Sequence, residues 1–483
     1  MACILLWCAL ALSLISLSSQ QTKDPLNDFC RRFGHQTAVV DRKLYIDGGQ
    51  VNWNPISANP LNYTNSYLLY NDLDQVQEAM PPLHANLTKN STVPNVSGGT
   101  LWADEVNKVL HAYGGEFSGS PEDFTLWSYD TILDQWNQTD TPQSIQRAAW
   151  GAGVAVNERA EGYYMGGWLS NQTMPGWNGA PFATSTLIRY DMVGNTWQNM
   201  SGPADGIGRA EGVMVFLPAS DAGLLIYFGG ILDTSRNGTV QGSPMNVIHI
   251  FDLASSKWYT QTAGGDVPED RKRFCAGATW AADHSSYNIY LYGGQGIPPN
   301  TTGFDDVYIL SLPSFTWVKW WPTQPGEGNP HNSLSCNVID GAQMLIIGGT
   351  FPISDQCDAN TVWGTHNLNL GASNIQNAMW YDYMPNLTVY NVPKELIAVI
   401  GGGPSGGATQ IRPQSWDNRD LPVYFSRVPT FPARTPTRAI PGPTSTSTGT
   451  PEESSNIAAI AGGAAGGGAA LLIVLGVLIW CYC

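Results

Sequence analysis

Six short apolar stretches in this chain each run into a pair of glycines, at intervals of 52 to 66 residues. The pairs are Gly48-Gly49, Gly114-Gly115, Gly166-Gly167, Gly229-Gly230, Gly293-Gly294 and Gly348-Gly349. A second pattern follows several of them, in which an aromatic residue and an aspartate precede a tryptophan at a fixed offset. It occurs at Trp136, Trp197 and Trp258, and Trp317 keeps the offset with Leu310-Ser311 in place of the aromatic residue and the aspartate. Motifs that recur at this spacing indicate one repeated supersecondary unit whose copies bury their core by stacking.

The unit is predicted to consist of four antiparallel strands. The run before each glycine pair is rich in Tyr, Ile and Leu, which favours a buried strand. A glycine pair ends such a strand because the turn beyond it needs φ angles that other residues resist. One apolar segment precedes each pair, and the aromatic-aspartate and tryptophan segments follow it. Four-stranded units repeated around an axis form a β-propeller, so we expect an all-β fold.

The combination of glycine pair, aromatic-aspartate pair and offset tryptophan resembles the kelch repeat, over roughly residues 30–391. We place the propeller domain at residues 30–426. A seventh glycine pair, Gly401-Gly402, fits the spacing, but the preceding segment Pro393–Ile400 also reads as a short helix with proline in its first turn. Six blades are therefore favoured, and seven stay possible.

Both ends of the chain suggest export and anchoring. Residues 1–19 read as a secretory signal peptide, and an uncleaved anchor is the alternative. Residues 427–456 are rich in Pro, Ser and Thr and are expected to form a disordered stalk. Residues 457–480 are uncharged and long enough to form a transmembrane helix. The resemblance extends here to single-pass fungal surface proteins. We therefore expect a type I plasma membrane protein at the cell surface, or else a glycolipid (GPI) anchor.

Glycosylation and disulfide bonds would agree with export. Ten Asn-x-Ser/Thr acceptors are present: Asn62, Asn86, Asn90, Asn95, Asn137, Asn171, Asn199, Asn237, Asn300 and Asn386. Four cysteines lie in the body of the chain, and an even number in an exported protein suggests two disulfides. Cys336 and Cys357 flank one glycine pair and are the expected couple. Cys30 and Cys275 would form the other.

Charge and motifs argue against several kinds of function. The net charge of −16 argues against binding to nucleic acid or to anionic lipid through a basic patch. None of the seven histidines forms a short metal-binding motif with another. There is no Gly-x-Ser-x-Gly elbow and no complete phosphate loop. We therefore predict no catalytic residue, no metal and no cofactor.

The kelch resemblance brings one enzymatic alternative. Galactose oxidase and related copper radical oxidases use a propeller of this type, and their site needs two tyrosines, two histidines and a cysteine bonded to one tyrosine. Here the body cysteines are expected to be paired. His35 and His331 stand before innermost strands of the first and sixth units, where we expect them to be packing residues. A surface-bound copper oxidase is kept as the second hypothesis.

Arginines recur 16–20 residues before the glycine pairs, at the start of the innermost strands. They are Arg32, Arg147, Arg209 and Arg273. A ring of arginines could bind an anion at the mouth of the channel. It could equally tie neighbouring blades together through carboxylates and backbone carbonyls, which is the interpretation we favour.

The long loops after the glycine pairs emerge on one face of a propeller, where insertions usually form the binding surface. They carry Trp53, Trp168, Trp177 and Phe351 among Asn, Ser and Pro. Flat aromatic rings beside amides suit sugars or peptides. The sequence therefore predicts a cell-surface recognition module that binds an extracellular protein or a cell-wall polysaccharide, and an enzymatic role is not expected.

Overall fold

The computed structural model describes residues 23–299, 301–323, 328–352, 354–372 and 379–441. The predicted signal peptide, the predicted span 457–480, the stalk beyond residue 441 and Asn300 lie outside them. All described strands and helices belong to one unit, residues 1–438, and residues 439–483 form a second. Among the described residues, no helix is long and apolar enough to cross a membrane.

Six antiparallel sheets carry the repeats, and each is built from consecutive segments of chain. Sheet 1 contains β2 (Gln36–Val40), β3 (Lys43–Asp47), β6 (Leu69–Asp72) and β7 (Leu83–His84). Sheet 2 contains β8 (Ser97–Asp104), β9 (Val109–Glu116), β10 (Leu126–Asp130) and β11 (Gln135–Thr139). Sheet 3 contains β12 (Ala152–Val156), β13 (Glu161–Met165), β16 (Thr186–Asp191) and β17 (Thr196–Ser201). The 3-10 helix η1 (Asn157–Arg159) joins β12 to β13.

The remaining three sheets follow the same order. Sheet 4 contains β19 (Val213–Leu217), β20 (Leu224–Phe228), β23 (Val247–Asp252) and β24 (Lys257–Thr262). Sheet 5 contains β27 (Cys275–Trp280), β28 (Tyr287–Tyr292), β30 (Val307–Leu312) and β31 (Thr316–Trp321), with the short β25 (Gly264–Gly265) beside β31. Sheet 6 has three described strands, β32 (Ser335–Ile339), β33 (Gln343–Ile347) and β34 (Thr365–Asn369), with the 3-10 helix η2 (Asn360–Val362) before the last.

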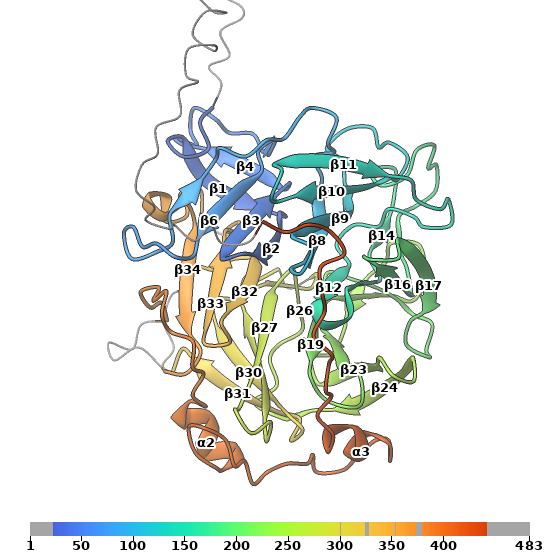
Figure 1. The fold of residues 1–483 in the computed structure, drawn as a ribbon, viewed down its shortest axis with the longest axis vertical. Coiled ribbons are helices and arrows are strands. Elements are labelled where there is room, and N and C mark those ends of the chain that lie inside the picture. Colours follow the sequence, from blue (N-terminus) through green and yellow to red (C-terminus); the bar gives the residue numbers. More distant parts are fainter. Residues whose placement is uncertain (1–22, 300, 324–327, 353, 373–378, 442–483) are drawn as a thin grey trace, which may run out of the picture. The chain divides into compact units, whose positions relative to one another are not determined.

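The first strand of each sheet faces the centre of the molecule (Figure 1). These innermost strands touch their neighbours in the order β2, β8, β12, β19, β27 and β32, and β32 touches β2 again. The strands surround a channel of about 650 Å³. Residues from all six line it: Thr37, Thr100, Gly153, Met214, Ala276 and Asn337. The arrangement is that of a propeller, as the repeats predicted.

The glycine pairs do what the sequence predicted. In all six pairs both glycines have positive φ, between 62° and 116°. At Gly348 a side chain would also be excluded by contact, because a Cβ atom there would lie 2.1 Å from the carbonyl oxygen of Arg32. The pair thus turns the chain sharply and allows sheet 6 to approach the segment before sheet 1.

A closed ring of backbone hydrogen bonds connects the sheets at the glycine-pair end. It runs through one residue at or just before the start of each innermost strand, and every N–H donates to the carbonyl of the next member at 2.6–2.9 Å. All six residues have positive φ. In order of donation the members are Gly34, Ser333, Arg273, Glu211, Trp150 and Gly98, whose N–H returns to Gly34. We call these residues the mouth ring.

The offset tryptophans hold adjacent sheets together. Trp317 is buried, as expected of a core residue, whereas Trp136, Trp197 and Trp258 are only half-buried. Three indole N–H groups donate across to carbonyl oxygens of the preceding segment of chain, those of Thr88, Ser201 and Met245. Trp197 instead packs against four aromatic rings: Trp102, Tyr113, Phe124 and Tyr190. The repeat motif therefore encodes contacts between blades as well as the core within one.

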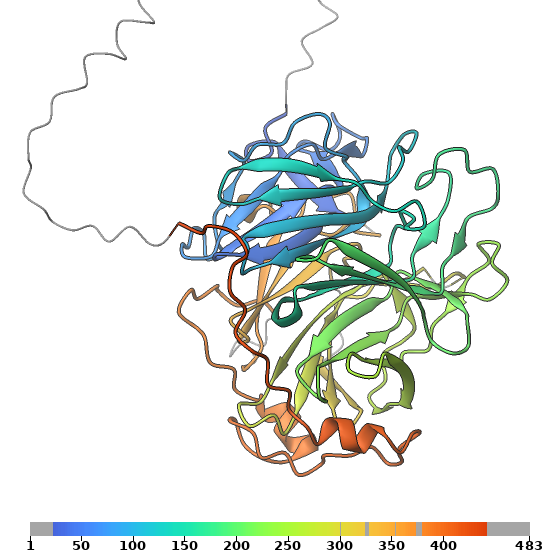
Figure 2. The ribbon, with the colours of Figure 1, turned by 45° about the vertical axis from the view of Figure 1, so that its right-hand side comes forward.

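Residues 379–438, which we call the C-terminal belt, run past the turns at the other end of the sheets. The belt contains the helices α2 (Lys394–Ile400) and α3 (Leu421–Phe425), seen at the foot of Figure 2. Tyr383 donates to the carbonyl of Leu73 beside sheet 1. The amide of Gly407 donates to Asp283, which lies in the turn of sheet 5. The belt continues across sheets 4, 3 and 2 and so contacts successive turns around the ring.

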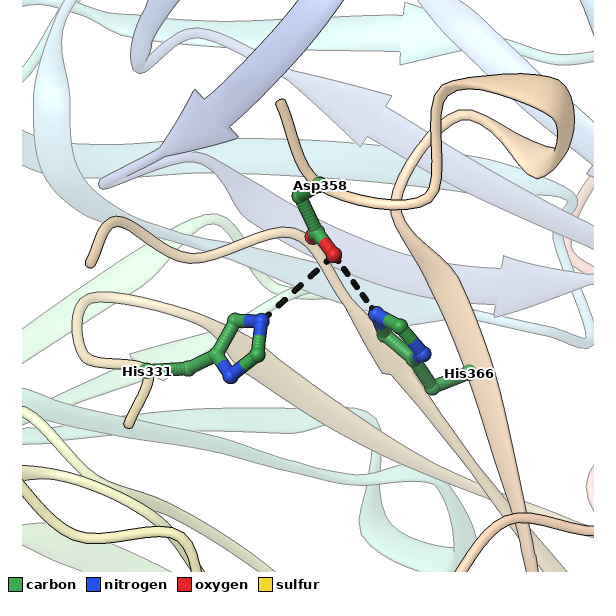
Figure 3. A group of neighbouring side chains, drawn as sticks. All are labelled: His331, Asp358 and His366. Atoms are coloured by element: carbon green, nitrogen blue, oxygen red, sulfur yellow. Dashed lines mark hydrogen bonds and ion pairs between the residues drawn. The ribbon is translucent and has the colours of Figure 1, made fainter. Parts of the chain in front are cut away.

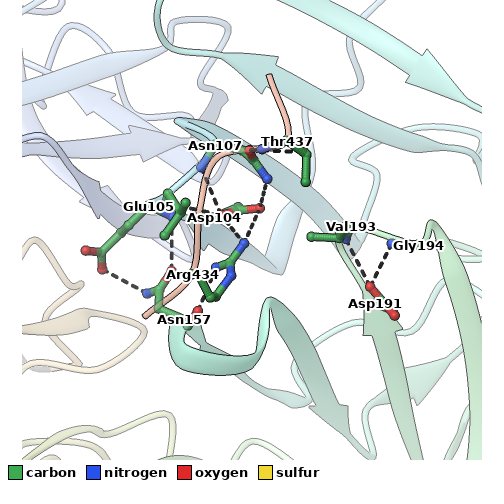
Figure 4. Close-up of polar contacts among 10 residues, drawn as sticks. Asp104, Glu105, Asn107, Asn157, Asp191, Val193, Gly194, Arg434 and Thr437 are labelled. Carbon is green, nitrogen blue, oxygen red and sulfur yellow. Dashed lines mark hydrogen bonds and ion pairs between the residues drawn. The ribbon is translucent and has the colours of Figure 1, made fainter. Parts of the chain in front are cut away.

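The start of the predicted stalk belongs to this belt, so the expectation of disorder was wrong for residues 427–438. Arginines in the segment find carboxylates on successive turns. Arg434 makes two hydrogen bonds to Asp104, at 2.9 and 3.0 Å, and a third to the carbonyl of Asn157 (Figure 4). Arg438 pairs with Asp130 at 2.5 Å. A proline- and threonine-rich composition therefore did not prevent order, because specific ion pairs compensate for the small apolar surface.

The segment before the seventh glycine pair is helical. Residues Lys394–Ile400 form α2, and the amide of Gly401 donates to the carbonyl of Ile397 at its end. Leu396 and Ile400 are buried against the core of sheets 5 and 6. Gly401-Gly402 therefore follows a helix and does not end a strand of a further sheet.

The predicted disulfide pairing was wrong. All four body cysteines are bonded, but as Cys30–Cys357 and Cys275–Cys336. Cys275 is the first residue of β27 and Cys336 the second residue of β32. These two innermost strands lie side by side. Cys30 lies on β1 (Phe29–Phe33), where its carbonyl accepts the amide of Asp358. Both disulfides therefore join cysteines of neighbouring repeat units, whereas the predicted Cys336–Cys357 bond would have lain within one unit.

Candidate functional site

The loops that follow the glycine pairs form small extra sheets at the mouth-ring end. One sheet contains β1, β4 (Gln50–Trp53) and β5 (Tyr63–Thr64), and another contains β14 (Trp168–Leu169) and β15 (Phe182–Ala183). A third contains β18 (Gly208–Ala210), β21 (Ile231–Asp233) and β22 (Gln241–Gly242), and a fourth β26 (Arg271–Lys272) and β29 (Gln295–Gly296). Except for the pair β14 and β15, which lies wholly within one loop, each joins the chain just before an innermost strand to the chain just after a glycine pair. We call this surface the loop face.

One network of side chains on the loop face joins three members of the mouth ring, Trp150, Glu211 and Arg273, to Lys272 and Trp168. We call it the mouth network. The buried carboxylate of Glu211 accepts hydrogen bonds from Arg273 Nε at 2.8 Å and from Trp168 Nε1 at 3.0 Å, and pairs with Lys272 at 3.1 Å. The guanidinium of Arg273 lies 4.0 Å above the ring of Trp150. Burial alone would raise the pKa of Glu211, but the charges of Arg273 and Lys272 and these hydrogen bonds lower it below its ordinary value. Glu211 is therefore an anion held between two cations.

Two of the four recurring arginines pair with carboxylates of the fold, which agrees with the interpretation favoured from the sequence. Arg273 joins the start of sheet 5 to Glu211 at the start of sheet 4. Arg147 is buried and donates to the carbonyl of Gly114, and Arg209 pairs with Asp205 at 2.5 Å. Arg32 is buried, and desolvation lowers its pKa to about 10. Arg209 and Arg273 are therefore paired with carboxylates, whereas buried nitrogens of Arg32 (Nε and Nη1) and of Arg147 (Nε) have no hydrogen-bond partner among the described residues.

The four predicted ligand-contacting aromatics have different surroundings. Trp53 is only 5% exposed and packs against Tyr63, so the expectation that it presents its ring to a ligand was wrong. Trp168 is half-buried and belongs to the mouth network. Phe351 is half-buried between Arg31 and His331.

Trp177, the fourth, lines a shallow hollow between two loops of the loop face. The hollow has a volume of about 760 Å³ and is bordered by Ser118–Pro121 on one side and by Asn171, Gln172 and Trp177 on the other. The indole of Trp177 donates to the carbonyl of Gly179 and packs against Phe182, so part of its ring is structural. Asn171, one of the glycosylation acceptors, borders the same hollow.

Two histidines and an aspartate meet on the loop face beside the Cys30–Cys357 disulfide (Figure 3). His366 Nε2 lies 2.8 Å and His331 Nε2 3.4 Å from Asp358 Oδ1. Burial alone would raise the pKa of Asp358, but the two imidazoles hold it well below its usual range. Sequence reasoning missed this cluster because its members come from three segments and form no short motif.

The copper radical site that the kelch resemblance raised does not match these residues. Such a site needs a cysteine bonded to a tyrosine. Every cysteine among the described residues is already in a disulfide, and the other cysteines lie at the two chain ends, outside them. The His331, Asp358 and His366 cluster offers no thiol.

Comparisons with known proteins agree with the repeat. The family model described as the KLHDC2/KLHL20/DRC7 Kelch-repeats domain matches residues 34–279, slightly more than half of the chain. A kelch repeat-containing protein of Arthroderma benhamiae is 31% identical over 520 residues, which covers 94% of this chain and 75% of that protein. Host cell factor of Drosophila melanogaster is 23% identical over 328 residues, 66% of this chain but only 20% of that protein.

Among solved structures, that of YjhT is similar with 13% sequence identity and a TM-score of 0.49, covering 68% of this chain and 94% of the other. The match to the family model and the long alignment with the fungal protein are sufficient to assign the family without this structure. This chain belongs to the kelch-repeat family.

Proposed function

We propose that this kelch-repeat protein is a recognition module that binds an extracellular protein through its loop face. The observation that carries the proposal is the difference between the two ends of the ring. The C-terminal belt covers turns at one end, while the other end is built from long loops around the mouth ring. In repeat proteins, loops inserted on one face usually form the binding surface.

The chemistry of the mouth network suits a protein ligand. Half-buried Trp150 and Trp168 lie beside Arg273 and Lys272, and all four retain some exposure. Tryptophan and arginine dominate the binding energy of protein interfaces because they combine a large apolar area with directed polar groups. The network is also held rigid by Glu211, so little side-chain entropy would be lost on binding.

A cell-wall polysaccharide is the second candidate, and the hollow at Trp177 favours it. An indole beside the amides of Asn171 and Gln172 can stack on a sugar ring and hydrogen-bond its hydroxyls. A glycan on Asn171 would occupy the same hollow. Binding there should therefore increase when Asn171 is replaced by glutamine.

The proposal includes export and anchoring at the cell surface. Glycosylation requires accessible acceptors, and eight of the nine described ones are exposed, namely Asn62, Asn86, Asn90, Asn137, Asn171, Asn199, Asn237 and Asn386. Asn95 is half-buried and should be modified least. We further propose that the six sheets are the full set of blades, that residues 1–19 are removed, and that residues 457–480 hold the protein in the plasma membrane.

Surface cross-linking on producing cells tests the recognition role. Lys272→Ala and Trp168→Ala change the mouth network, and Lys394→Ala on α2 is the control at the belt end, where the lysine is 86% exposed. A protein partner should be cross-linked to the wild type and to the control, and at least tenfold less to the two mouth variants. If all four chains capture the same proteins equally, the loop face is not the binding surface.

A parallel assay tests the polysaccharide candidate. Trp177→Ala should reduce retention on insoluble cell-wall polysaccharide, while Lys272→Ala should not. The anchor is tested by release: detergent should free the protein from membranes, and phosphatidylinositol-specific phospholipase should not. Efficient release by the lipase would replace the transmembrane proposal with a glycolipid anchor.

A further inference from the structure

His331, Asp358 and His366 are brought together from three separate segments of sheet 6. His331 precedes β32, Asp358 lies in the loop after the glycine pair, and His366 is on β34. Both imidazole rings turn the same kind of atom, Nε2, toward one carboxylate (Figure 3). One nitrogen or oxygen from each residue lies within 4.8 Å of the others.

The hydrogen bonds around His331 determine which of its nitrogens carries a proton. The hydroxyl of Tyr292 lies 2.7 Å from Asp305 Oδ1, and a carboxylate only accepts, so Tyr292 donates its proton there. The oxygen of Tyr292 then accepts from His331 Nδ1 at 3.1 Å. A neutral His331 therefore carries its proton on Nδ1 and directs the lone pair of Nε2 at Asp358.

Two acceptors thus face each other at 3.4 Å, in a place that is almost closed to solvent. Asp358 is 2% and His331 4% exposed. The second carboxylate oxygen of Asp358, Oδ2, is buried and has no hydrogen-bond partner among the described residues. Such an arrangement is stable only if a positive charge lies between the two groups. That charge is either a second proton on His331 or a metal ion.

We propose that His331, Asp358 and His366 form a binding site for one divalent transition metal ion of the zinc class. Two imidazoles and one carboxylate are ligands that zinc prefers, whereas calcium and magnesium require mostly oxygen. Metal–ligand bonds of about 2.0 Å in tetrahedral geometry place ligand atoms about 3.3 Å apart. The distance from His331 Nε2 to Asp358 Oδ1 already fits this value. The distance from His366 Nε2 to the same oxygen must widen by about 0.5 Å.

The surroundings of the cluster are those of a supported metal site. A ligating histidine usually donates its other N–H to a fixed acceptor, which here is Tyr292 for His331. The ring of Trp380 stacks on His366 at 4.6 Å. On metal binding the Nε2 proton of His366 is displaced, and its neutral ring then carries a proton on Nδ1. The site lies on the loop face but does not depend on the proposed recognition role.

Metal binding to the full exported chain tests the proposal. Cys481 and Cys483, the cysteines outside the disulfides that remain once residues 1–19 are removed, are replaced by serine so that free thiols bind no metal. After treatment with a chelator, the chain should take up one zinc ion, and neither calcium nor magnesium should compete. At free zinc about 100-fold above Kd, the melting temperature should rise by about 3 °C.

Variants distinguish this site from chance binding to surface histidines. His366→Ala should abolish stoichiometric uptake, and Tyr292→Phe, which keeps the ligands, should weaken zinc affinity by about 10- to 100-fold. His84→Ala, on β7 in sheet 1, should bind zinc as the wild type does. Should His366→Ala fail to fold, Tyr292→Phe and the tetrahedral absorption spectrum of bound Co²⁺ decide. Less than about 0.1 zinc per chain at saturating metal, or equal affinity in Tyr292→Phe, would overturn the proposal and leave a protonated His331.

Discussion

The Cys30–Cys357 disulfide should contribute more to stability than any other single covalent link in the propeller. It joins positions 327 residues apart, whereas Cys275–Cys336 spans 61. The loss of chain entropy in the unfolded state grows with the logarithm of the loop length, which gives upper values of about 6 and about 4 kcal/mol, respectively. A local Cys336–Cys357 bond would have contributed only about 3 kcal/mol.

Paired serine variants measure this difference. The double change Cys30→Ser with Cys357→Ser and the double change Cys275→Ser with Cys336→Ser are each unfolded in guanidinium chloride, and their midpoints are compared with that of the wild type. The first double variant should unfold at the lower concentration. Native strain reduces such effects, so the order of the two variants is the firm expectation.

Peptide mapping without reduction provides the direct check on the same chains. The wild type should yield one peptide that contains Cys30 with Cys357 and one that contains Cys275 with Cys336. Recovery of a Cys336–Cys357 peptide, or a smaller loss of stability in the Cys30/Cys357 variant than in the other, would refute the reasoning from loop length and strand neighbourhood.

Three further predictions concern stability. The folded pKa of Glu211 lies below its ordinary value of 4.5, so its contribution to the free energy of unfolding is complete above that pH and is lost as pH falls through the folded pKa. Glu211→Gln should therefore cost about 2–3 kcal/mol at pH 7. The prediction fails if thermal melts show that acidification destabilises the wild type no more than the variant. Trp317→Ala should cost about 3–5 kcal/mol and Trp177→Ala clearly less, so equal melting temperatures would make the loop tryptophan structural. Arg434→Ala should speed limited proteolysis of residues 427–438, whereas Arg427→Ala, whose ion pair is exposed, should not.

The repeated part of the fold could be predicted because its signals are local. A glycine pair permits the positive φ angles that a sharp turn needs, and an aspartate that accepts backbone amides marks the following turn. Asp191, for example, accepts the amides of Val193 and Gly194, as Figure 4 shows. Six copies in phase then define the architecture. The choice between a helix and a further strand at Lys394–Ile400 needed tertiary information, because both patterns fit the same residues.

The parts that sequence reasoning missed depend on which sheets become neighbours. Cys275 and Cys336 lie 61 residues apart but on adjacent innermost strands. His331 and His366 meet only because the loop that carries Asp358 folds back between them. The belt was misjudged for a different reason: its few arginines each find a carboxylate, and composition alone does not reveal such pairs.

At the mouth ring, the residue that suits the backbone conformation differs from the residue that a binding function would need. Gly34 and Gly98 show that glycine fulfils the backbone role, and a side chain in the left-handed conformation costs roughly 1 kcal/mol or more. The backbone conformation alone would therefore favour glycine at Trp150, Glu211, Arg273 and Ser333 as well. Related propellers should vary at these positions in an all-or-none manner, with glycine where nothing is bound and a committed side chain where something is. Ser333, whose hydroxyl donates to Asn332 Oδ1, is the position where glycine should be gained at the least functional loss.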